Sequence, residues 1–149
     1  MRNLLTILLF ITFALSGCKK EDSAAAQLII DKEIIENYLA DKSLTAQSTS
    51  SGLYYIITKQ GTGVKPTINS QVTVNYTGKL VDGTQFDSGT ASFPLTNVIK
   101  GWQEGIPLFN AGGNGKLFIP SGLAYGSAGR PGIPANSVLI FDVYLISVQ

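Results

Sequence analysis

The sequence predicts an α+β fold, in which a curved antiparallel β-sheet wraps over one short α-helix and an N-terminal amphipathic helix precedes the sheet. Two observations favour this class. Residues 23–46 have helical periodicity, whereas the chain after residue 52 consists of short β-branched and aromatic segments separated by Gly-rich turns, with a single helical interval at 98–108. The chain has 149 residues, enough for one domain with a sizeable core.

The first residues follow a secretory plan. Arg2 supplies a positive charge, residues 4–15 are apolar apart from threonines, and Leu15-Ser16-Gly17-Cys18 ends the run with small residues, as in bacterial lipoprotein signals. We expect residues 1–17 to be a signal peptide and Cys18 to be acylated. An ordinary cleaved signal with an incidental cysteine and an uncleaved anchor are the alternatives, although the apolar run is shorter than the roughly 20 residues of a comfortable membrane span.

Cys18 is the only cysteine, so its acylation would leave the mature protein without thiol or disulfide chemistry. Several acyl chains on one residue would attach the protein durably to a membrane. Lys19 directly after the cysteine resembles the sorting signal for the outer membrane, and the charged run at 19–22 resembles a surface-export tag. The expected location is therefore the cell envelope, lipid-anchored at the outer membrane, on a face that the sequence leaves open.

Residues 18–47 are expected to hold the lipidated N-terminus and the amphipathic helix. Three alanines at 24–26 favour a helix, and apolar side chains recur at steps of three and four residues opposite a polar face that includes Asp31 and Lys32. The apolar stripe consists of Leu28, Ile30 or Ile34, Ile35, Tyr38 and Leu39. It is expected to pack on the following domain or on its own copy, and binding to a partner protein is the alternative.

Residues 48–149 are expected to form the globular domain, beginning with a Ser- and Gly-rich linker at 48–52. Strands are expected at 53–58, 72–77, 117–119 and 138–148, and the last is apolar on both faces, which is typical of the middle of a sheet. Asp82-Gly83 predicts a tight hairpin turn. Gly101 and Gly105 are expected to keep the helix at 98–108 short.

Several function classes are disfavoured by composition. The chain has no histidine, which removes the commonest general base and metal ligand, and its acidic residues are not spaced as a calcium loop, so we expect neither metal nor cofactor. Eleven basic and ten acidic residues leave no basic stripe, so nucleic acid is not an expected partner. The Gly-rich stretch at 112–116 lacks the Ser or Thr of a phosphate-binding loop and predicts a tight turn.

Five ordered stretches resemble FKBP-type peptidyl-prolyl cis-trans isomerases from about residue 52 to 148. They are Val72-Thr-Val-Asn-Tyr-Thr-Gly78, Asp82-Gly-Thr-Gln-Phe-Asp-Ser88, Val98-Ile-Lys-Gly-Trp102, Leu123-Ala-Tyr-Gly126 and Val138-Leu-Ile-Phe-Asp-Val143. The resemblance implies a rotamase with an FKBP-like fold that acts on proline-containing polypeptides, and the N-terminal signal indicates that these fold in the cell envelope. It also implies macrolides as candidate inhibitors.

The resemblance also implies a pocket. An apolar floor and walls would come from Tyr76, Phe86, Val98, Trp102 and Phe141, with Phe93 closing one side and Ile133 on the opposite loop. For hydrogen bonding, Ile99 would offer its backbone N–H to a substrate carbonyl, Tyr125 a hydroxyl, and Asp87 a carboxylate at the rim. Tyr76, Phe86, Asp87, Ile99, Trp102, Tyr125 and Phe141 are the expected catalytic set. Phe93, Val98 and Ile133 are expected to bind substrate.

Other interpretations of these residues remain open. Each aromatic residue taken singly is explained by core packing, Asp87 by capping of a turn, and Tyr125 by an exposed loop. The domain as a whole could also be a membrane-anchored module that binds a proline-containing loop or acts as a chaperone without catalysis, or an envelope scaffold that assembles through its helix. The uncharged segment 89–92 and Asn97 differ from common family residues, and Arg130 occupies a position that varies among members. These features bear on substrate preference and macrolide affinity.

Overall fold

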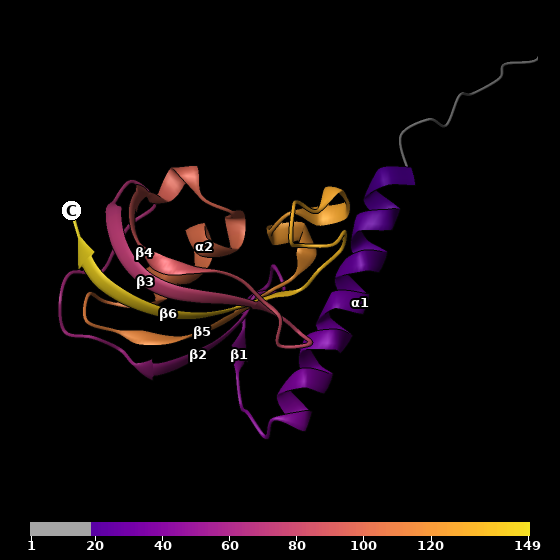
Figure 1. Cartoon of the computed structure of the whole chain (residues 1–149), viewed down its shortest axis with the longest axis horizontal. Helices are drawn as coiled ribbons and strands as arrows, with labels where there is room; N and C mark the ends of the chain where they lie inside the picture. The colour runs from indigo at the N-terminus through magenta and orange to yellow at the C-terminus, as the bar shows by residue number, and fades with distance from the viewer. Residues whose placement is uncertain (1–18) are drawn as a thin grey trace, which may run out of the picture.

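The computed structural model describes residues 19–149, with side chains from residue 23 onward. Six strands form one antiparallel sheet in the order β1-β2-β5-β6-β3-β4. The strands are β1 (Gln47–Ser48), β2 (Tyr54–Lys59), β3 (Gln71–Leu80), β4 (Gln85–Pro94), β5 (Asn114–Ile119) and β6 (Leu139–Val148). The sheet curves around one short helix, α2 (Lys100–Gly105), as Figure 1 shows. The predicted α+β class is confirmed.

Helix α2 sits close against the inner face of the sheet because of its two glycines. A Cβ atom on Gly101 would lie 2.4 Å from Cγ2 of Ile119, and one on Gly105 would lie 2.7 Å from Cδ1 of Leu117. The glycines therefore permit this close contact, besides shortening the helix. The helix is shorter than the expected 98–108, since Val98 and Ile99 are extended and residues Ile106–Leu108 form a separate 3₁₀ turn.

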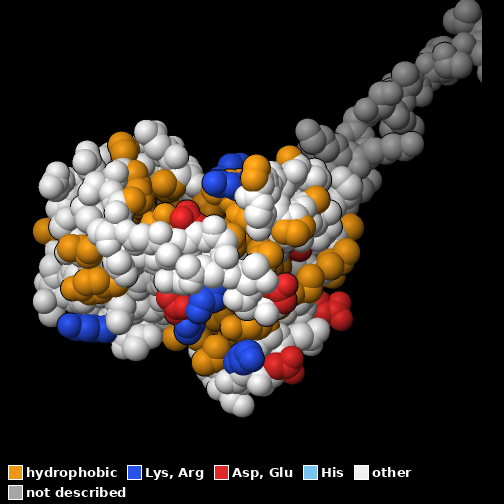
Figure 2. Space-filling view, viewed as in Figure 1, with side chains coloured by type: hydrophobic (Ala, Val, Ile, Leu, Met, Phe, Trp, Pro, Cys, Tyr) orange, Lys and Arg blue, Asp and Glu red, His pale blue; other side chains and the backbone are white. Residues whose placement is uncertain are grey.

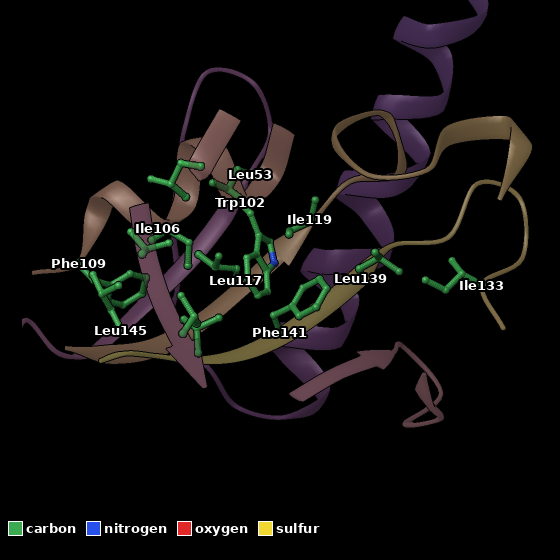
Figure 3. Close-up of a cluster of buried hydrophobic side chains, with 14 residues drawn as sticks. Leu53, Trp102, Ile106, Phe109, Leu117, Ile119, Ile133, Leu139, Phe141 and Leu145 are labelled. Atoms are coloured by element: carbon green, nitrogen blue, oxygen red, sulfur yellow. The ribbon is translucent and has the colours of Figure 1, made fainter. Parts of the chain in front are cut away.

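The main core lies between α2 and the inner face of the sheet (Figure 3). Its fully buried side chains come from all parts of the globular region and include Leu53, Val72, Val74, Leu95, Ile106, Phe109, Leu117, Ile119, Leu139 and Leu145. Alternate residues of β3 and β6 point into this core, as the period of two in a strand requires. Trp102 and Phe141 lie at one end of it, where the core meets a cavity.

The β3–β4 hairpin turns where Asp82-Gly83 predicts it. Gly83 has a φ of +91°, its N–H donates to the Leu80 carbonyl over 3.0 Å, and the Thr84 N–H donates to Oδ1 of Asp82 over 2.8 Å. The hairpin implies a strand after the turn, but the extent of β4 to Pro94 was not expected, because its small and polar residues carry no alternating pattern. It forms at the sheet edge by pairing with β3 alone.

Strand β6 lies between β5 and β3, so its interior place in the sheet is confirmed. The expectation that both its faces are buried is wrong at its second half, where Tyr144 and Ile146 are 44% and 41% exposed. These residues point to the outer face of the sheet, which is covered by protein only near the start of β6. The Gly-rich stretch at 112–116 forms the expected tight turn only at its start. Gly112 has a φ of +81° and the Gly113 N–H donates to the Asn110 carbonyl over 2.9 Å, but Asn114 already begins β5.

The outer face is covered by the N-terminal helix α1 (Lys19–Asp41), which runs along one end of the sheet (Figure 1). Ile35 and Leu39 are buried against Tyr54, Phe118 and Ile140. Figure 2 shows further hydrophobic side chains on the molecular surface. The helix ends five residues before the expected end at 46, because Ser43 takes a φ of +51° and the chain turns toward β1. No helix among residues 19–149 is long and apolar enough to cross a membrane.

The most unexpected feature of α1 is Asp31, which the periodicity places on the polar face but which is fully buried. Its carboxylate is satisfied by three donors: Oδ2 accepts from the Ser121 N–H over 2.8 Å and from the Ser121 hydroxyl over 2.6 Å, and Oδ1 accepts from Nε2 of Gln27 over 2.8 Å. A buried charge is tolerated when such bonds replace its hydration. The expected helix face was therefore wrong at this residue.

Candidate active site

An open cavity of about 450 Å³ lies at the end of the main core. It is bounded by β3, β4, the segment leading into α2, and the loop that follows β5. Its lining consists of Tyr76, Phe86, Asp87, Ala91, Phe93, Asn97, Val98, Ile99, Trp102, Tyr125, Arg130 and Phe141. The volume is within the range of small-ligand sites, and most of the lining is apolar.

Nine of the ten side chains or backbone groups expected at the pocket line this one cavity. The exception is Ile133, which is 3% exposed and belongs to the main core. In Figure 3, Ile133 lies away from Trp102, on the far side of Leu139 and Phe141. Ala91, Asn97 and Arg130 line the cavity without having been expected. Ala91 alternates with Phe93 on β4, a signal that the strand period would have given had β4 been recognised.

Five aromatic rings build the walls and floor, four of them through edge-to-face pairs and Phe93 through a tilted contact at 49°. The centroid of Trp102 lies 5.1 Å from both Tyr76 and Phe141, with interplanar angles of 85° and 80°. Phe86 meets Phe141 at 5.5 Å and 86°, and Phe93 meets Trp102 at 5.3 Å. Such T-shaped pairs are the favoured arrangement for aromatic side chains and fix one another's orientation. The floor is consequently rigid and apolar.

Glycine at position 78 makes room for this arrangement. Gly78 pairs with Asp87 on one side and with Phe141 on the other. A Cβ atom there would lie 2.6 Å from Cζ of Phe86 and 2.8 Å from Cε1 of Phe141. The two rings can therefore meet across β3 only above a residue without a side chain.

The indole N–H of Trp102 is part of the buried floor and makes no hydrogen bond with the described residues. A buried donor without an acceptor costs free energy, on the order of 1–3 kcal/mol. Trp102 therefore contributes the shape of its ring to the floor and not a hydrogen bond.

Tyr76 and Asp87 form one polar pair at the rim. The Tyr76 hydroxyl, on β3, donates to Oδ2 of Asp87, on β4, over 3.0 Å. Burial raises the pKa of Tyr76, and the hydrogen bond to Asp87 and its negative charge raise it further, while the positive charge of Arg130 acts in the opposite direction. Tyr76 is therefore neutral at physiological pH, and its proton is committed to Asp87.

Two donors at the cavity are not committed in this way. Ile99 precedes α2, and its carbonyl accepts from the N–H groups of Trp102 and Gln103, at 2.9 and 3.1 Å. Its own N–H has no acceptor among residues 19–149. Nε2 of Gln103 donates to the Val98 carbonyl over 2.8 Å, which holds the extended segment in place. The Ile99 N–H is thus a rigid donor free for a ligand.

Tyr125 supplies the second donor. Nη1 of Arg130 donates to the Tyr125 hydroxyl oxygen over 2.8 Å, and the guanidinium carbon lies 5.0 Å from the centroid of the same ring. Since the oxygen accepts, the hydroxyl hydrogen remains available, and none of the described side chains receives it. The cavity therefore offers one N–H and one O–H to a ligand above an aromatic floor.

The described side chains provide no metal centre. No group of three or more potential ligands occurs among residues 23–149. The chain also has no histidine that could activate a serine or accept a proton near neutral pH. What the cavity can do is remove a polar ligand from water and hold it by two hydrogen bonds. Cys18 lies outside the described residues.

Comparisons with known proteins agree with this geometry. Residues 62–146 match the model of the family described as FKBP-type peptidyl-prolyl cis-trans isomerase. A relative with the same description, FkpA from Aeromonas hydrophila, is 48% identical over 132 residues, which cover 80% of this chain and 49% of the relative. The peptidyl-prolyl cis-trans isomerase Mip from Coxiella burnetii is 46% identical over 109 residues, covering 69% of this chain and 47% of that protein.

The crystal structure of FkpA from Escherichia coli has a similar fold. It superposes with a TM-score of 0.74 at 42% identity, over 87% of this chain and 62% of that one. The chain spans about half the length of the two named relatives that it matches.

Proposed function

Because the chain belongs to the FKBP-type peptidyl-prolyl cis-trans isomerase family, we propose that it accelerates cis-trans isomerisation of X-Pro bonds in polypeptides. One observation supports this most strongly: five packed aromatic residues and two uncommitted donors, the Ile99 N–H and the Tyr125 hydroxyl, meet at one cavity. In an aromatic cluster that served only as a core, we would not expect two hydrogen-bond donors without acceptors at residues that line a cavity.

The mechanism that fits this cavity is differential solvation. Resonance keeps the X-Pro amide planar, behind a barrier of about 18–20 kcal/mol. Twisting the C–N bond breaks the resonance and lowers the dipole of the amide. An apolar site destabilises the planar, more polar ground state more than the twisted state, so burial of the amide against Trp102 and Phe141 lowers the barrier.

The two donors add selectivity for the twisted state. A carbonyl bonded to the Ile99 N–H or the Tyr125 hydroxyl is held in one orientation while the other side of the amide rotates. One hydrogen bond that forms better in the transition state contributes on the order of 1–3 kcal/mol, or about ten- to a hundredfold in rate. No proton needs to leave or enter the substrate.

The assay that tests this follows an X-Pro tetrapeptide by protease coupling or by NMR exchange, with and without the purified protein. We expect saturable acceleration that is unchanged by a chelator and flat between about pH 6 and 8, because ordinary side chains other than histidine and cysteine titrate outside that range. Asp87→Asn should retain much of the rate. Binding without acceleration would instead favour a non-catalytic proline-binding module, and a rate that follows one ionisation would favour acid catalysis.

The cellular location of the protein and the division of its chain into signal, anchor and domain are part of the same proposal. Residues 1–17 act as a lipoprotein signal, acylated Cys18 anchors the protein at the outer membrane, and residues 48–149 carry the isomerase domain for proteins that fold in the cell envelope. Cys18→Ala should abolish incorporation of labelled fatty acid and leave isomerase activity intact. Continued labelling of that variant would refute the anchor.

Macrolides are proposed as inhibitors through the same cavity. The support is its volume of about 450 Å³ and its apolar floor. A macrolide that competes with the peptide should quench or shift the fluorescence of Trp102, which is the only tryptophan in the chain. If a saturating concentration of the macrolide does not displace the peptide, macrolides are not ligands of this cavity.

A further inference from the structure

We propose that Arg130 makes the cavity selective for prolines flanked by an acidic residue. This inference rests on the proposed isomerase function and assigns a substrate preference to the same site. It depends on three properties of Arg130: its place at the mouth of the cavity, the fixation of its side chain, and the absence of an acidic partner.

The backbone of Arg130 is fixed by a tight turn. The Arg130 N–H donates to the Ile133 carbonyl over 2.9 Å, and the Ile133 N–H donates to the Arg130 carbonyl over 2.8 Å. Gly132 takes the φ of +83° that this turn needs. The side chain of Ile133 is buried in the main core, so it holds the turn to the domain. This anchoring is the structural contribution of Ile133, which does not itself reach the cavity.

The guanidinium is fixed as well. It donates to the Tyr125 hydroxyl over 2.8 Å and lies over the ring of Tyr125, 5.0 Å from its centroid. Stacking and a hydrogen bond together orient the planar fork of an arginine, which a lysine cannot reproduce. These two contacts order the long side chain of Arg130 in the free protein. Binding of a substrate to the guanidinium therefore costs less conformational entropy.

The charge of Arg130 has no carboxylate partner within ion-pair distance among the described residues. The one ion pair among the described residues joins Lys116 and Asp142, on the outer face of the sheet. Asp87, the other charged residue of the cavity lining, lies on β4, accepts a hydrogen bond from the Tyr76 hydroxyl and forms no ion pair with Arg130. A peptide in the cavity therefore meets an unpaired cation on the side of Tyr125.

An acidic side chain next to the proline would gain an ion pair at this rim. Because the site is open to solvent, the gain is modest, about two- to fivefold in kcat/KM over a neutral isostere. It should diminish as salt screens the charges. Leucine or another apolar residue at the same position would be accepted by the apolar walls independently of Arg130.

The experiment compares tetrapeptides with amidated ends that carry Glu, Gln or Lys directly before the proline, and a second series with these residues directly after it. Both kcat/KM and the affinity measured by Trp102 fluorescence are determined for the full chain. We expect a Glu to Gln ratio of about two to five in at least one series and a Lys to Gln ratio below one. Ratios of one in both series would overturn the inference.

Variants assign the effect to the residue. Arg130→Gln should bring the Glu to Gln ratio to one, Arg130→Glu should invert it, and Arg130→Lys should retain part of it. Lys65→Gln is the matched control, because it removes the same charge from an exposed position outside the cavity and should leave the ratio unchanged. An equal loss in Lys65→Gln and Arg130→Gln would mean that net charge, not Arg130, sets the preference.

The affinity measurement separates this inference from the proposed function. Glu-selective binding without acceleration of any peptide would support the role of Arg130 and refute the isomerase. Acceleration without charge preference would support the isomerase and refute the role of Arg130.

Discussion

The two faces of the sheet treat their polar groups in opposite ways. On the outer face, beneath α1, the buried Asp31 receives three hydrogen bonds, and the Tyr54 hydroxyl donates to Glu36 over 2.5 Å. On the inner face, the Ile99 N–H and the Tyr125 hydroxyl are left without acceptors beside an aromatic floor. Stability and function are therefore separated in this domain. The polar groups of the α1 interface are hydrogen-bonded within the protein, whereas the cavity leaves its donors for a substrate.

The most severe test of this division is removal of α1. Residues 48–149 contain every cavity residue, but without α1 they expose Phe118, Ile140 and Tyr54. Loss of the buried Ile35 and Leu39 alone removes about 3–6 kcal/mol, at 1.5–3 kcal/mol per buried side chain. We expect a much lower unfolding midpoint in urea, with isomerase activity retained by the folded fraction at low temperature. A folded fragment without activity would show that α1 contributes to the site.

A pair of substitutions compares the faces directly. Phe141→Ala in the cavity and Ile35→Ala under α1 each remove a buried side chain, and each should cost about 2–5 kcal/mol in unfolding free energy. Only Phe141→Ala should also reduce kcat/KM strongly, because it admits water to the floor. Activity is measured under conditions in which both variants are folded. Equal activity losses would contradict the separation of the two faces.

Alkaline pH should weaken the α1 face. Burial first, and then the hydrogen bond to Glu36 and its charge, raise the pKa of Tyr54 from 10.0 to about 12. The folded protein thus holds this proton more tightly than the unfolded chain, so the stabilisation is complete below pH 10 and is lost as the pH rises toward 12. It is worth on the order of 2 kcal/mol. Tyr54→Phe should make the unfolding free energy less dependent on pH between pH 10 and 12. If the dependence is unchanged, other tyrosines cause it.

The smallest effect is expected for Asp31→Asn. The amide retains one oxygen for Ser121 but loses the charge that strengthens both bonds, a loss of about 1 kcal/mol. Asp31→Ala should cost more, since it leaves the buried Ser121 N–H without an acceptor. Both variants should keep the wild-type KM when folded. A raised KM in Asp31→Asn would indicate that the loop after β5, which carries Tyr125, depends on this bond for its position.

Most residues of the cavity could be predicted from the sequence, but few contacts of the α1 interface could. Residues of β3, α2 and β6 could be placed because strand alternation and five ordered motifs determine their neighbours. Asp31 could not, because its partner Ser121 lies 90 residues away and helical periodicity alone assigns a carboxylate to solvent. The extent of β4 beyond the hairpin turn was missed, since small polar residues at a sheet edge have no periodic pattern. Arg130 was noticed as a departure from the family, but its contact with Tyr125 depends on a turn that only the tertiary structure defines.

The position of α1 also determines what an anchored protein could reach. The helix begins one residue after Cys18, and its 23 residues extend for about 35 Å along the flank of the sheet, held there by Asp31 and Ile35. With Cys18 acylated as proposed, α1 would connect the anchor to the domain that carries the cavity. The protein would then act as a surface catalyst, searching a thin layer in two dimensions, where membrane-bound or emerging clients have a high effective concentration and freely diffusing ones gain nothing.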